Sequence, residues 1–315
     1  MAFSDYLRMM RPHQWYKNLL VFLAIIFGRI TIDDIEYPTL FLIDRYFPLV
    51  VGFVILCMIS SAGYLINDIQ DLDKDAAHPE KKDRPLPSGS ASPRIAAVLA
   101  AGLMLGGLVL SSFNTMFFLV VILYIINSQA YNHLLRNYAV VDVSTIAIGF
   151  ILRAIAGAFL IRVPFTSWLV IGVFFVALVL GFGKRKNELQ LMGEDAAEHK
   201  EVFTQYTDKM LDQGILMSAT WVVMFYALYC YENYSSVMLE QPVMLTVPFV
   251  AGIVLRYVYL LDTGSPVGRK PHLAIRDKGI LLGGLLFGLM LVWTLFFWVP
   301  VQEFFLELFP PLFYW

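Results

Sequence analysis

The sequence predicts an all-α integral membrane protein with about nine transmembrane helices around a polar cavity that opens to the cytoplasmic face. Of the 315 residues, 58% are hydrophobic and only 15% are charged, whereas soluble domains carry about 25% charged residues. Long apolar runs recur along the chain, and acidic and basic residues gather where these runs end. These observations exclude a soluble globular domain. We expect one nine-helix transmembrane catalytic domain over residues 1–315.

Each predicted span is a long run with few or no charges, since a helix needs about 20 apolar residues to cross the hydrocarbon core. The uncharged stretch Ile95–Leu135 is too long for one crossing, and the polar residues 111–115 divide it into two spans. The aromatic tail Gln302–Trp315 is expected at the membrane interface. The other spans are predicted at Tyr16–Ile32, Tyr46–Ile66, Val140–Ile161, Pro164–Gly183, Gln213–Tyr231, Gln241–Leu261 and Gly279–Val301.

The distribution of Lys and Arg predicts the orientation. Eighteen of the 23 fall in alternate connections, which the positive-inside rule places in the cytoplasm together with the N-terminus. These connections include the loops 67–94, 184–209 and 262–278. Nine spans then leave the C-terminus outside, and the active site faces the cytoplasm from the cell membrane. Arg153 and Arg256 lie within spans, where a charge is costly and usually faces a polar cavity.

The first candidate site lies where the second span leaves the membrane. At about 100° per residue, Asp68, Asp71 and Asp75 share one face of a helix, with Asn67 beside them. Such side chains repel one another unless a cation lies among them, and oxygen ligands of this kind suit Mg²⁺ that is shared with substrate phosphates. The pattern therefore predicts a magnesium site; an acidic, solvated helix end is the alternative.

A basic loop follows this acidic segment. Lys81, Lys82 and Arg84 lie in a Pro- and Gly-marked stretch, and cations beside a carboxylate–metal cluster indicate a polyanionic ligand. Arg84, between Asp83 and Pro85, is the best candidate. Ordinary positive-inside charge explains the two lysines equally well.

The second candidate site begins in the segment from Tyr131 to Asp142. Asp142 opens the fifth span, and Arg153 follows eleven residues later, close to three helical turns, so that both lie on one face. They could line one cavity. A mutual salt bridge, or a helix cap formed by Asp142, is the alternative.

The third candidate site is the end of the sixth span. Lys184, Arg185 and Lys186 form a basic trio, and Glu188 is the i+4 neighbour of Lys184. Membrane anchoring alone explains the trio, but the closely placed Glu188 favours a binding function.

The motif Asn67-Asp68-x-x-Asp71-x-x-x-Asp75 resembles the first aspartate-rich motif of the UbiA superfamily of membrane prenyltransferases, in which nine transmembrane helices surround a polar cavity. The chain is most similar to the branch of decaprenyl-phosphate phosphoribosyltransferases. That narrower resemblance rests on Arg11-Pro12-x-Gln14-Trp15-x-Lys17-Asn18, on residues 151–157, and on Gly183-Lys184-Arg185-x-x-Glu188-Leu189. It covers nearly the whole chain, from Arg11 to about the ninth span.

One departure from the superfamily pattern supports this branch. Ordinary members often carry a second motif of the form Asp-x-x-x-Asp, but here Asp142 is followed four residues later by Ile146. The missing carboxylate argues against an ordinary prenyl diphosphate donor and favours the phosphoribosyl branch, which has a similarly reduced motif.

The resemblance implies a reaction and a set of residue roles. The reaction moves 5-phosphoribose from phosphoribosyl diphosphate to the phosphate of a polyprenyl lipid, with release of pyrophosphate, and it depends on Mg²⁺. Asp142, Asp71 and Lys184 are the expected catalytic residues. The metal ligands would be Asn67, Asp68, Asp71 and Asp75. Substrate would contact Lys17, Arg84, Tyr131, Arg153, Lys184, Arg185 and Glu188, with Arg153 holding either Asp142 or the lipid phosphate.

The expected partners are phosphoribosyl diphosphate, polyprenyl phosphate and the bilayer, with no nucleic acid; a homo-oligomer is left open. The first alternative is a conventional prenyltransferase that uses a prenyl diphosphate and an aromatic or glycerol-phosphate acceptor. In that case Tyr64, Tyr131 or Phe150 would shield an allylic cation. The second alternative is a transporter, which is disfavoured because the charged clusters lie at span ends and not at the membrane midplane.

Overall fold

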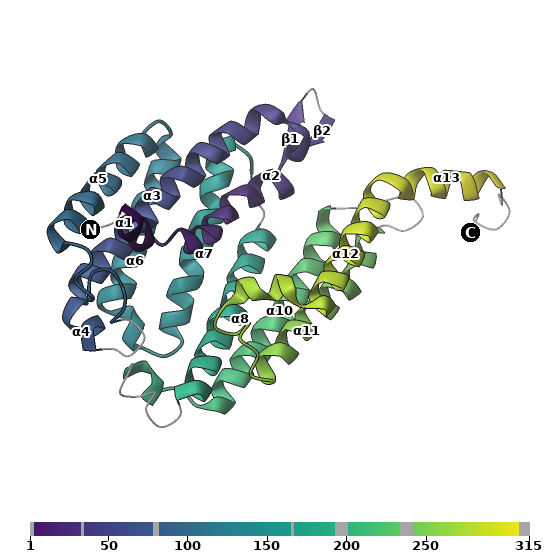
Figure 1. The fold of residues 1–315 in the computed structure, drawn as a ribbon. Coiled ribbons are helices and arrows are strands. Elements are labelled where there is room, and N and C mark those ends of the chain that lie inside the picture. Colours follow the sequence, from purple (N-terminus) through teal and green to yellow (C-terminus); the bar gives the residue numbers. More distant parts are fainter. Residues whose placement is uncertain are drawn as a thin grey trace. The chain divides into compact units, whose positions relative to one another are not determined.

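The computed structural model describes residues 3–32, 35–77, 82–164, 167–192, 201–233 and 242–308 (Figure 1). Eight helices in these ranges are long and apolar enough to cross a membrane. The predicted fold class, an all-α integral membrane protein, is confirmed; the cavity and the side on which it opens stay predictions. The chain forms two compact units: unit 1 is Met1–Arg136 with Ser144–Thr166, and unit 2 is Asn137–Val143 with Ser167–Trp315.

Unit 1 holds the N-terminal half of the helices and one short hairpin. Its long helices are α3 (Tyr46–Gln70), α5 (Pro93–Ser111), α6 (Thr115–His133) and most of α7 (Val141–Ile161). Its shorter elements are α1 (Phe3–Met9), η1 (Pro12–Phe22), α2 (Leu23–Phe27), β1 (Arg29–Ile32), β2 (Ile35–Pro38), η2 (Thr39–Phe41), η3 (Ile43–Arg45), α4 (Leu72–Ala77) and η4 (Leu135–Asn137), whose last residue belongs to unit 2.

Unit 2 begins with the first residues of α7 and continues with the C-terminal helices. These are α8 (Ser167–Met192), η6 (Glu201–Thr204), α10 (Asp208–Asn233), η7 (Pro242–Thr246), α11 (Val247–Asp262), η8 (Pro271–Arg276), α12 (Lys278–Val292), the π-helical turn η9 (Trp293–Phe297) and α13 (Trp298–Leu308). Parts of several predicted segments lie outside the described residues: 78–81 of the loop 67–94, which includes Lys81, 165–166 of the span Pro164–Gly183, 193–200 of the loop 184–209, Gln241 of the span Gln241–Leu261, and 309–315 of the aromatic tail.

The first predicted span, Tyr16–Ile32, is wrong as a single α-helix. The segment starts as the 3₁₀ helix η1, continues as α2 to Phe27, and then enters the β1–β2 hairpin. Gly28 is extended, and Thr39 Oγ1 donates to the carbonyls of Ile25 (2.9 Å) and Gly28 (2.8 Å), which satisfies the end of α2. Because a 3₁₀ helix rises about 2.0 Å per residue, η1 and α2 together reach roughly 30 Å, about the thickness of the hydrocarbon core.

Small residues let helices approach closely in unit 1. A Cβ on Gly157 of α7 would lie 1.9 Å from the carbonyl oxygen of Val21, and one on Gly52 of α3 would lie 2.2 Å from Leu160 Cδ1. These positions bring η1 and α3 against α7, as small residues do in membrane helix packing. The result is a buried core that includes Val21, Ile25 and Phe117.

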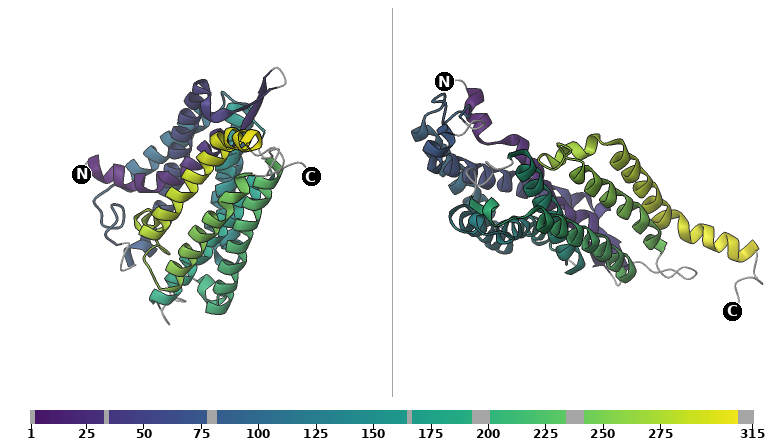
Figure 2. Two further views of the ribbon diagram at one scale, coloured as in Figure 1. Left: turned by 90° about the vertical axis from the view of Figure 1, so that its right-hand side faces the viewer. Right: turned by 90° about the horizontal axis from the view of Figure 1, so that it is seen from below.

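In unit 2, α8 and α10 run side by side (Figures 1 and 2). The ring of Phe175 on α8 stacks on Trp221 and Phe225 of α10, with centroids 5.9 and 5.5 Å apart. A Cβ on Gly214 would lie 3.1 Å from the ring of Phe182, so the glycine lets this ring pack against α10. These aromatic contacts fix the pairing of the two helices.

The helix that begins with α12 changes its winding before it continues as α13. The turn Trp293–Phe297 is π-helical and ends three residues before Pro300. A proline inside a helix has no N–H to donate, and its ring clashes with the carbonyl four residues earlier. The wider π turn accommodates this, so the helix continues to Leu308.

Candidate active site

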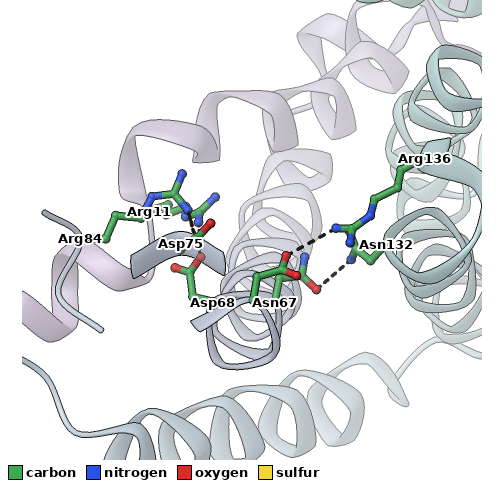
Figure 3. Close-up of polar contacts among 8 residues, drawn as sticks. Arg11, Asn67, Asp68, Asp75, Arg84, Asn132 and Arg136 are labelled. Carbon is green, nitrogen blue, oxygen red and sulfur yellow. Dashed lines mark hydrogen bonds and ion pairs between the residues drawn. The ribbon is translucent and has the colours of Figure 1, made fainter. Parts of the chain in front are cut away.

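The first polar cluster lies where α3 passes into α4, within unit 1 (Figure 3). We use this name for the four predicted metal ligands and the four side chains that contact them. The ligands are Asn67, Asp68, Asp71 and Asp75, and their partners are Arg11, Arg84, Asn132 and Arg136.

The three aspartates do not lie on one continuous helix, which corrects the sequence prediction. α3 ends at Gln70, Asp71 caps it with φ −93° and ψ 13°, and Asp75 lies on α4. Backbone hydrogen bonds from Asp71 N to Asn67 O (2.9 Å) and from Asp75 N to Asp71 O (2.8 Å) keep the helical spacing across the turn. Asp68 and Asp75 therefore still meet, and they share a partner in Arg84.

Two arginines cover Asp68 and Asp75 from one side (Figure 3). Arg84 Nη1 lies 2.8 Å from Asp75 Oδ2 and 3.3 Å from Asp68 Oδ1, and Arg11 Nη2 also pairs with Asp68 Oδ1. The side chains of Asp75 and Asp68 are only 3% and 8% exposed, whereas the side chain of Arg84 is 35% exposed. Buried carboxylates need such partners, because an unpaired buried charge is very costly.

Arg136 and Asn132 lie on the other side of the cluster from Arg11 and Arg84 (Figure 3). Arg136 Nη1 lies 3.4 Å from Asp71 Oδ2, and Asn132 Nδ2 donates to Asn67 Oδ1 over 2.9 Å. Asp71 is the more open of the carboxylates, with 30% of its side chain exposed. Every predicted metal ligand therefore has an oxygen bound by the chain's own donors.

Two other predicted substrate residues lie in the same unit as this cluster. Lys17 is on η1 and Tyr131 is on α6, and both side chains are partly buried. Their assignment to substrate stays a prediction.

Arg153 is the centre of a buried network in unit 1. Its Nε donates to Asn18 Oδ1 (2.8 Å), its Nη1 to the Gly149 carbonyl (2.7 Å) and its Nη2 to the Tyr124 hydroxyl (2.7 Å). The guanidinium also lies 4.5 Å from the centroid of the Tyr124 ring. Of the two roles predicted for Arg153, the one at Asp142 is wrong, because the donors of Arg153 go to these groups on α7, α6 and η1. The other role, at the lipid phosphate, stays a prediction. Through Asn18, Arg153 holds η1 against the helices.

The second polar cluster lies in unit 2 and consists of Asp142, Lys184, Arg185, Glu188 and Tyr206. Arg185 Nε donates to Asp142 Oδ2 (2.7 Å), and its Nη1 donates to Glu188 Oε2 (3.0 Å). Lys184 Nζ lies 3.8 Å from Glu188 Oε1. Asp142 is fully buried and the Arg185 side chain is 5% exposed, whereas Lys184 is 51% exposed. The structure thus brings together four residues that the sequence placed in two separate sites.

Tyr206 completes this cluster and fixes the turn before α7. Its hydroxyl donates to Asp142 Oδ1 (2.5 Å) and accepts from the backbone N–H of Val140 (2.8 Å). Burial, and then the hydrogen bond to Asp142, raise the pKa of Tyr206 well above its ordinary value of 10, so the hydroxyl stays protonated. Val140 has φ 68°, a strained conformation for a β-branched residue, and Tyr206 stabilises it there.

Lys186 belongs to a different group from its two basic neighbours. Its Nζ lies 2.6 Å from Asp212 Oδ1 on α10 and 2.7 Å from Asp262 Oδ1 on α11. The lysine side chain is 7% exposed. It therefore ties the ends of α8, α10 and α11 together within unit 2, which is a structural task.

Sequence reasoning missed several members of the two clusters. Arg11 and Asn132 lie inside segments that the motifs singled out, and only this location could have marked them as members of the cluster. Arg136 likewise lies in the segment from Tyr131 to Asp142, and no role of its own was predicted for it from the sequence. Tyr206 lies 64 residues from Asp142 in an unremarkable segment, and no spacing in the sequence marks it.

The side chains of the first polar cluster are of the types that bind a hard divalent cation, but their present arrangement does not form a metal site. Carboxylate and amide oxygens are the ligands that Mg²⁺ prefers. Within the described ranges, however, no group of three His, Cys, Asp or Glu residues is arranged to hold a metal ion. The carboxylates instead bind guanidinium groups, which a metal would have to displace.

Comparison with known proteins gives the family. Residues 39–275 match the UbiA prenyltransferase family. A decaprenyl-phosphate phosphoribosyltransferase of Mycolicibacterium smegmatis is 32% identical over 284 residues, which cover 87% of this chain and 87% of the relative. A protein of the same name from Corynebacterium glutamicum is 30% identical and covers 86% of this chain and 81% of its own length.

The fold agrees with solved structures of the family. A UbiA homolog from Archaeoglobus fulgidus, bound to GPP and Mg²⁺, superposes with a TM-score of 0.66 and 19% identity over 92% of this chain and 98% of its own. The resemblance expected from the motifs is thereby confirmed in both sequence and fold. With its apolar helices, its polar clusters and its full-length relatives, the chain belongs to the UbiA prenyltransferase family and is an integral membrane transferase.

Proposed function

We propose that the protein is a Mg²⁺-dependent polyprenyl-phosphate phosphoribosyltransferase. It transfers 5-phosphoribose from phosphoribosyl diphosphate to a polyprenyl, decaprenyl-type phosphate and releases pyrophosphate. The observation that carries the proposal is the similarity, at 32% and 30% identity and over most of the chain, to proteins named for this activity. The cations of the two polar clusters support it, since the donor carries a 5-phosphate besides its diphosphate.

The first polar cluster is proposed to bind the diphosphate of the donor. Asn67, Asp68, Asp71 and Asp75 would hold Mg²⁺, which neutralises charge on the departing pyrophosphate when it is bound. Arg84 is partly exposed beside the carboxylates and is suited to phosphate oxygens through charge-assisted hydrogen bonds. Lys17 and Tyr131 are proposed as further substrate contacts, and Arg153 as the residue that keeps η1, and with it Lys17, in place.

The second polar cluster is proposed to contribute one cation directly and to orient another. Lys184 is exposed and only loosely paired with Glu188, so it is available to a phosphate. Arg185 is buried between Asp142 and Glu188. The sequence predicts Asp142 as a catalytic residue. Because its carboxylate is fully buried and bound by Arg185 and Tyr206, we propose that it orients Arg185.

The reaction needs no strong base. The bond between the anomeric carbon and the diphosphate breaks, pyrophosphate leaves with the electron pair, and an oxygen of the lipid phosphate forms the new bond. The acceptor is already an anion, so no proton has to be removed from it. The chain's task is to position the two anions and to compensate their charge, which is the main route to catalysis for such groups.

The location proposed for this chemistry is the cytoplasmic face of the cell membrane, with residues 1–315 acting as one catalytic domain. The charge distribution of the loops supports this orientation.

The proposal is tested by pyrophosphate release from the purified protein in three substrate combinations. With Mg²⁺, phosphoribosyl diphosphate and polyprenyl phosphate together should release pyrophosphate, and a chelator or Asp71→Asn should abolish the release. Omission of either substrate should do the same. A prenyl diphosphate with an aromatic acid should give little release.

Other outcomes identify the alternatives. Release only from the prenyl diphosphate would make the protein a conventional prenyltransferase. Saturable uptake of an ion into vesicles without any pyrophosphate release would favour a transporter. Full activity in excess chelator would remove the metal from the proposal.

A further inference from the structure

We propose that Arg11, Arg84 and Arg136 occupy the carboxylates of the first polar cluster in the resting protein and move to phosphate oxygens when a metal-bound diphosphate enters. The arginines thus make metal binding depend on the diphosphate. This inference rests on the metal–diphosphate part of the proposed function. It assigns a role to Arg11 and Arg136, to which the reaction scheme gives none, and it adds a role in the resting protein to Arg84.

The first argument is the order in which groups meet the solvent. The Asp75 and Asp68 side chains are 3% and 8% exposed, whereas those of Arg84 and Arg136 are 35% and 38% exposed. The guanidinium groups cover the carboxylates and remain open to water themselves (Figure 3). At Asp68 and Asp75 a cation from solution therefore meets other cations first, and it has to displace them to reach an oxygen. Asp71 is more open, with 30% of its side chain exposed beside Arg136.

The second argument is charge balance. The paired groups are three aspartates and three arginines, so the paired set is formally neutral. A divalent cation added alone would leave a large excess of positive charge in a partly buried place, which is costly. A diphosphate that arrives with the metal restores the balance, and its oxygens suit the fork of a guanidinium group. Metal and diphosphate should therefore bind cooperatively.

The third argument is that the pairs are built to exchange. The contacts of Arg84 with Asp68 (3.3 Å) and of Arg136 with Asp71 (3.4 Å) are longer than the roughly 2.7–2.9 Å of a good charged hydrogen bond. The contact of Arg84 with Asp75 (2.8 Å) lies within that range, so Arg84 is held firmly by one of its two carboxylates. Arg11 lies between α1 and η1 with a left-handed backbone conformation. Arg84 lies in the loop before α5, and Arg136 lies in the single turn η4. A rotation of these long side chains can move the guanidinium groups without any shift of a spanning helix.

The backbone around Arg84 is held in place while its guanidinium group changes partners. The Arg84 carbonyl accepts from Ser88 N (3.0 Å), and the Pro85 carbonyl accepts from Ala91 N (2.8 Å), so the loop is cross-linked by its own hydrogen bonds. The side chain can therefore change partners while its Cα stays in place. Arg84 is the strongest candidate of the three, since it bridges two carboxylates.

The test measures binding of Mn²⁺ alone, by electron paramagnetic resonance, to the purified full chain and to Arg84→Gln. If Arg84 masks the carboxylates, its removal should raise the affinity for Mn²⁺ about tenfold, or about 1.4 kcal/mol. The affinity for inorganic pyrophosphate in the presence of Mn²⁺ should instead fall about tenfold, because a phosphate ligand is lost. A structural role predicts no such opposite changes, since a damaged site loses both ligands.

Controls separate the exchange from general effects of charge and folding. Arg94→Gln removes an exposed arginine from the start of α5 and should leave both affinities unchanged. Arg84→Lys keeps the charge and should lie between the wild type and Arg84→Gln. Should Arg84→Gln not fold, Arg136→Gln gives the same test at Asp71, the more exposed carboxylate.

The outcomes distinguish this inference from the proposed function. An unchanged or lowered Mn²⁺ affinity in folded Arg84→Gln or Arg136→Gln overturns the exchange, even if phosphoribosyl transfer is observed. Opposite shifts for Mn²⁺ and pyrophosphate support it, even if phosphoribosyl diphosphate proves not to be the donor. Absence of Mn²⁺ binding in every variant overturns the exchange together with the metal assignment.

Discussion

Asp142 depends on Tyr206 for its place in the second polar cluster. The Tyr206 hydroxyl binds Asp142 and the N–H of the strained Val140 at the same time, so one side chain fixes both the turn and the carboxylate. Asp142 in turn holds Arg185. A change at Tyr206 should therefore reach Arg185 through Asp142.

Tyr206→Phe removes this hydroxyl and keeps the ring. The loss leaves a buried carboxylate with one donor fewer and costs about 1–3 kcal/mol of stability. We expect a lower Tm and a kcat lowered about tenfold, roughly the effect of 1.4 kcal/mol on the barrier, with the donor KM little changed. Because the pKa of Tyr206 is raised well above 10, ionisation of this hydroxyl should not contribute to the alkaline limb of the wild-type pH profile.

Tyr138→Phe is the matched control, since Tyr138 lies in the same turn with 51% of its surface exposed. It should behave as the wild type. Equal kinetics and equal Tm for the two variants would refute the positioning role of Tyr206.

At the scale of elements, the sequence predicted most spans closely, because apolar length is a local property. The span predicted at Val140–Ile161 is the helix Val141–Ile161, and the polar stretch 111–115 does separate α5 from α6. Asn114 caps α6 by accepting from Phe117 N over 3.0 Å. The first span failed because Gly28 and a hairpin partner end the helix, and hairpin pairing is not visible in hydropathy.

The candidate site was less predictable than the spans for a physical reason. The acidic motif is local, but the partners of its residues are distant in sequence: Arg11 is 57 residues from Asp68, and Arg136 is 65 residues from Asp71. Such pairs arise from packing and leave no periodic pattern. The end of α3 at Gln70, just before Asp71, was also not predictable, because the pattern of apolar residues does not show whether a polar helix end continues or stops.

The helix α5 allows a direct test of the proposed orientation. Ser88 precedes it and Ser112 follows it, both exposed, and its 19 residues span roughly 28 Å at about 1.5 Å per residue. The two native cysteines, Cys57 and Cys230, are buried and should give little background. In intact cells, an impermeant thiol reagent should label Ser112→Cys and not Ser88→Cys. The reverse pattern would invert the topology and move the chemistry to the outer face.

At the scale of the whole molecule, the account depends on the choice of donor. The family admits prenyl transfer, as its name states, whereas the full-length relatives are named for phosphoribosyl transfer. The lone Asp142 in place of a second acidic motif, and the cations present in the two polar clusters, favour a donor with an additional phosphate. The nature of the lipid product therefore decides the central claim.

The most direct measurement is a competition analysed by mass spectrometry of the extracted lipids. Purified protein with Mg²⁺ is given isotope-labelled phosphoribosyl diphosphate and a prenyl diphosphate together, with polyprenyl phosphate and an aromatic acid as acceptors. The account predicts that polyprenyl phosphate gains one labelled phosphoribosyl group and that the aromatic acid stays unmodified. A prenylated aromatic acid, with no label in any polyprenyl lipid, would contradict the account and leave only the family assignment.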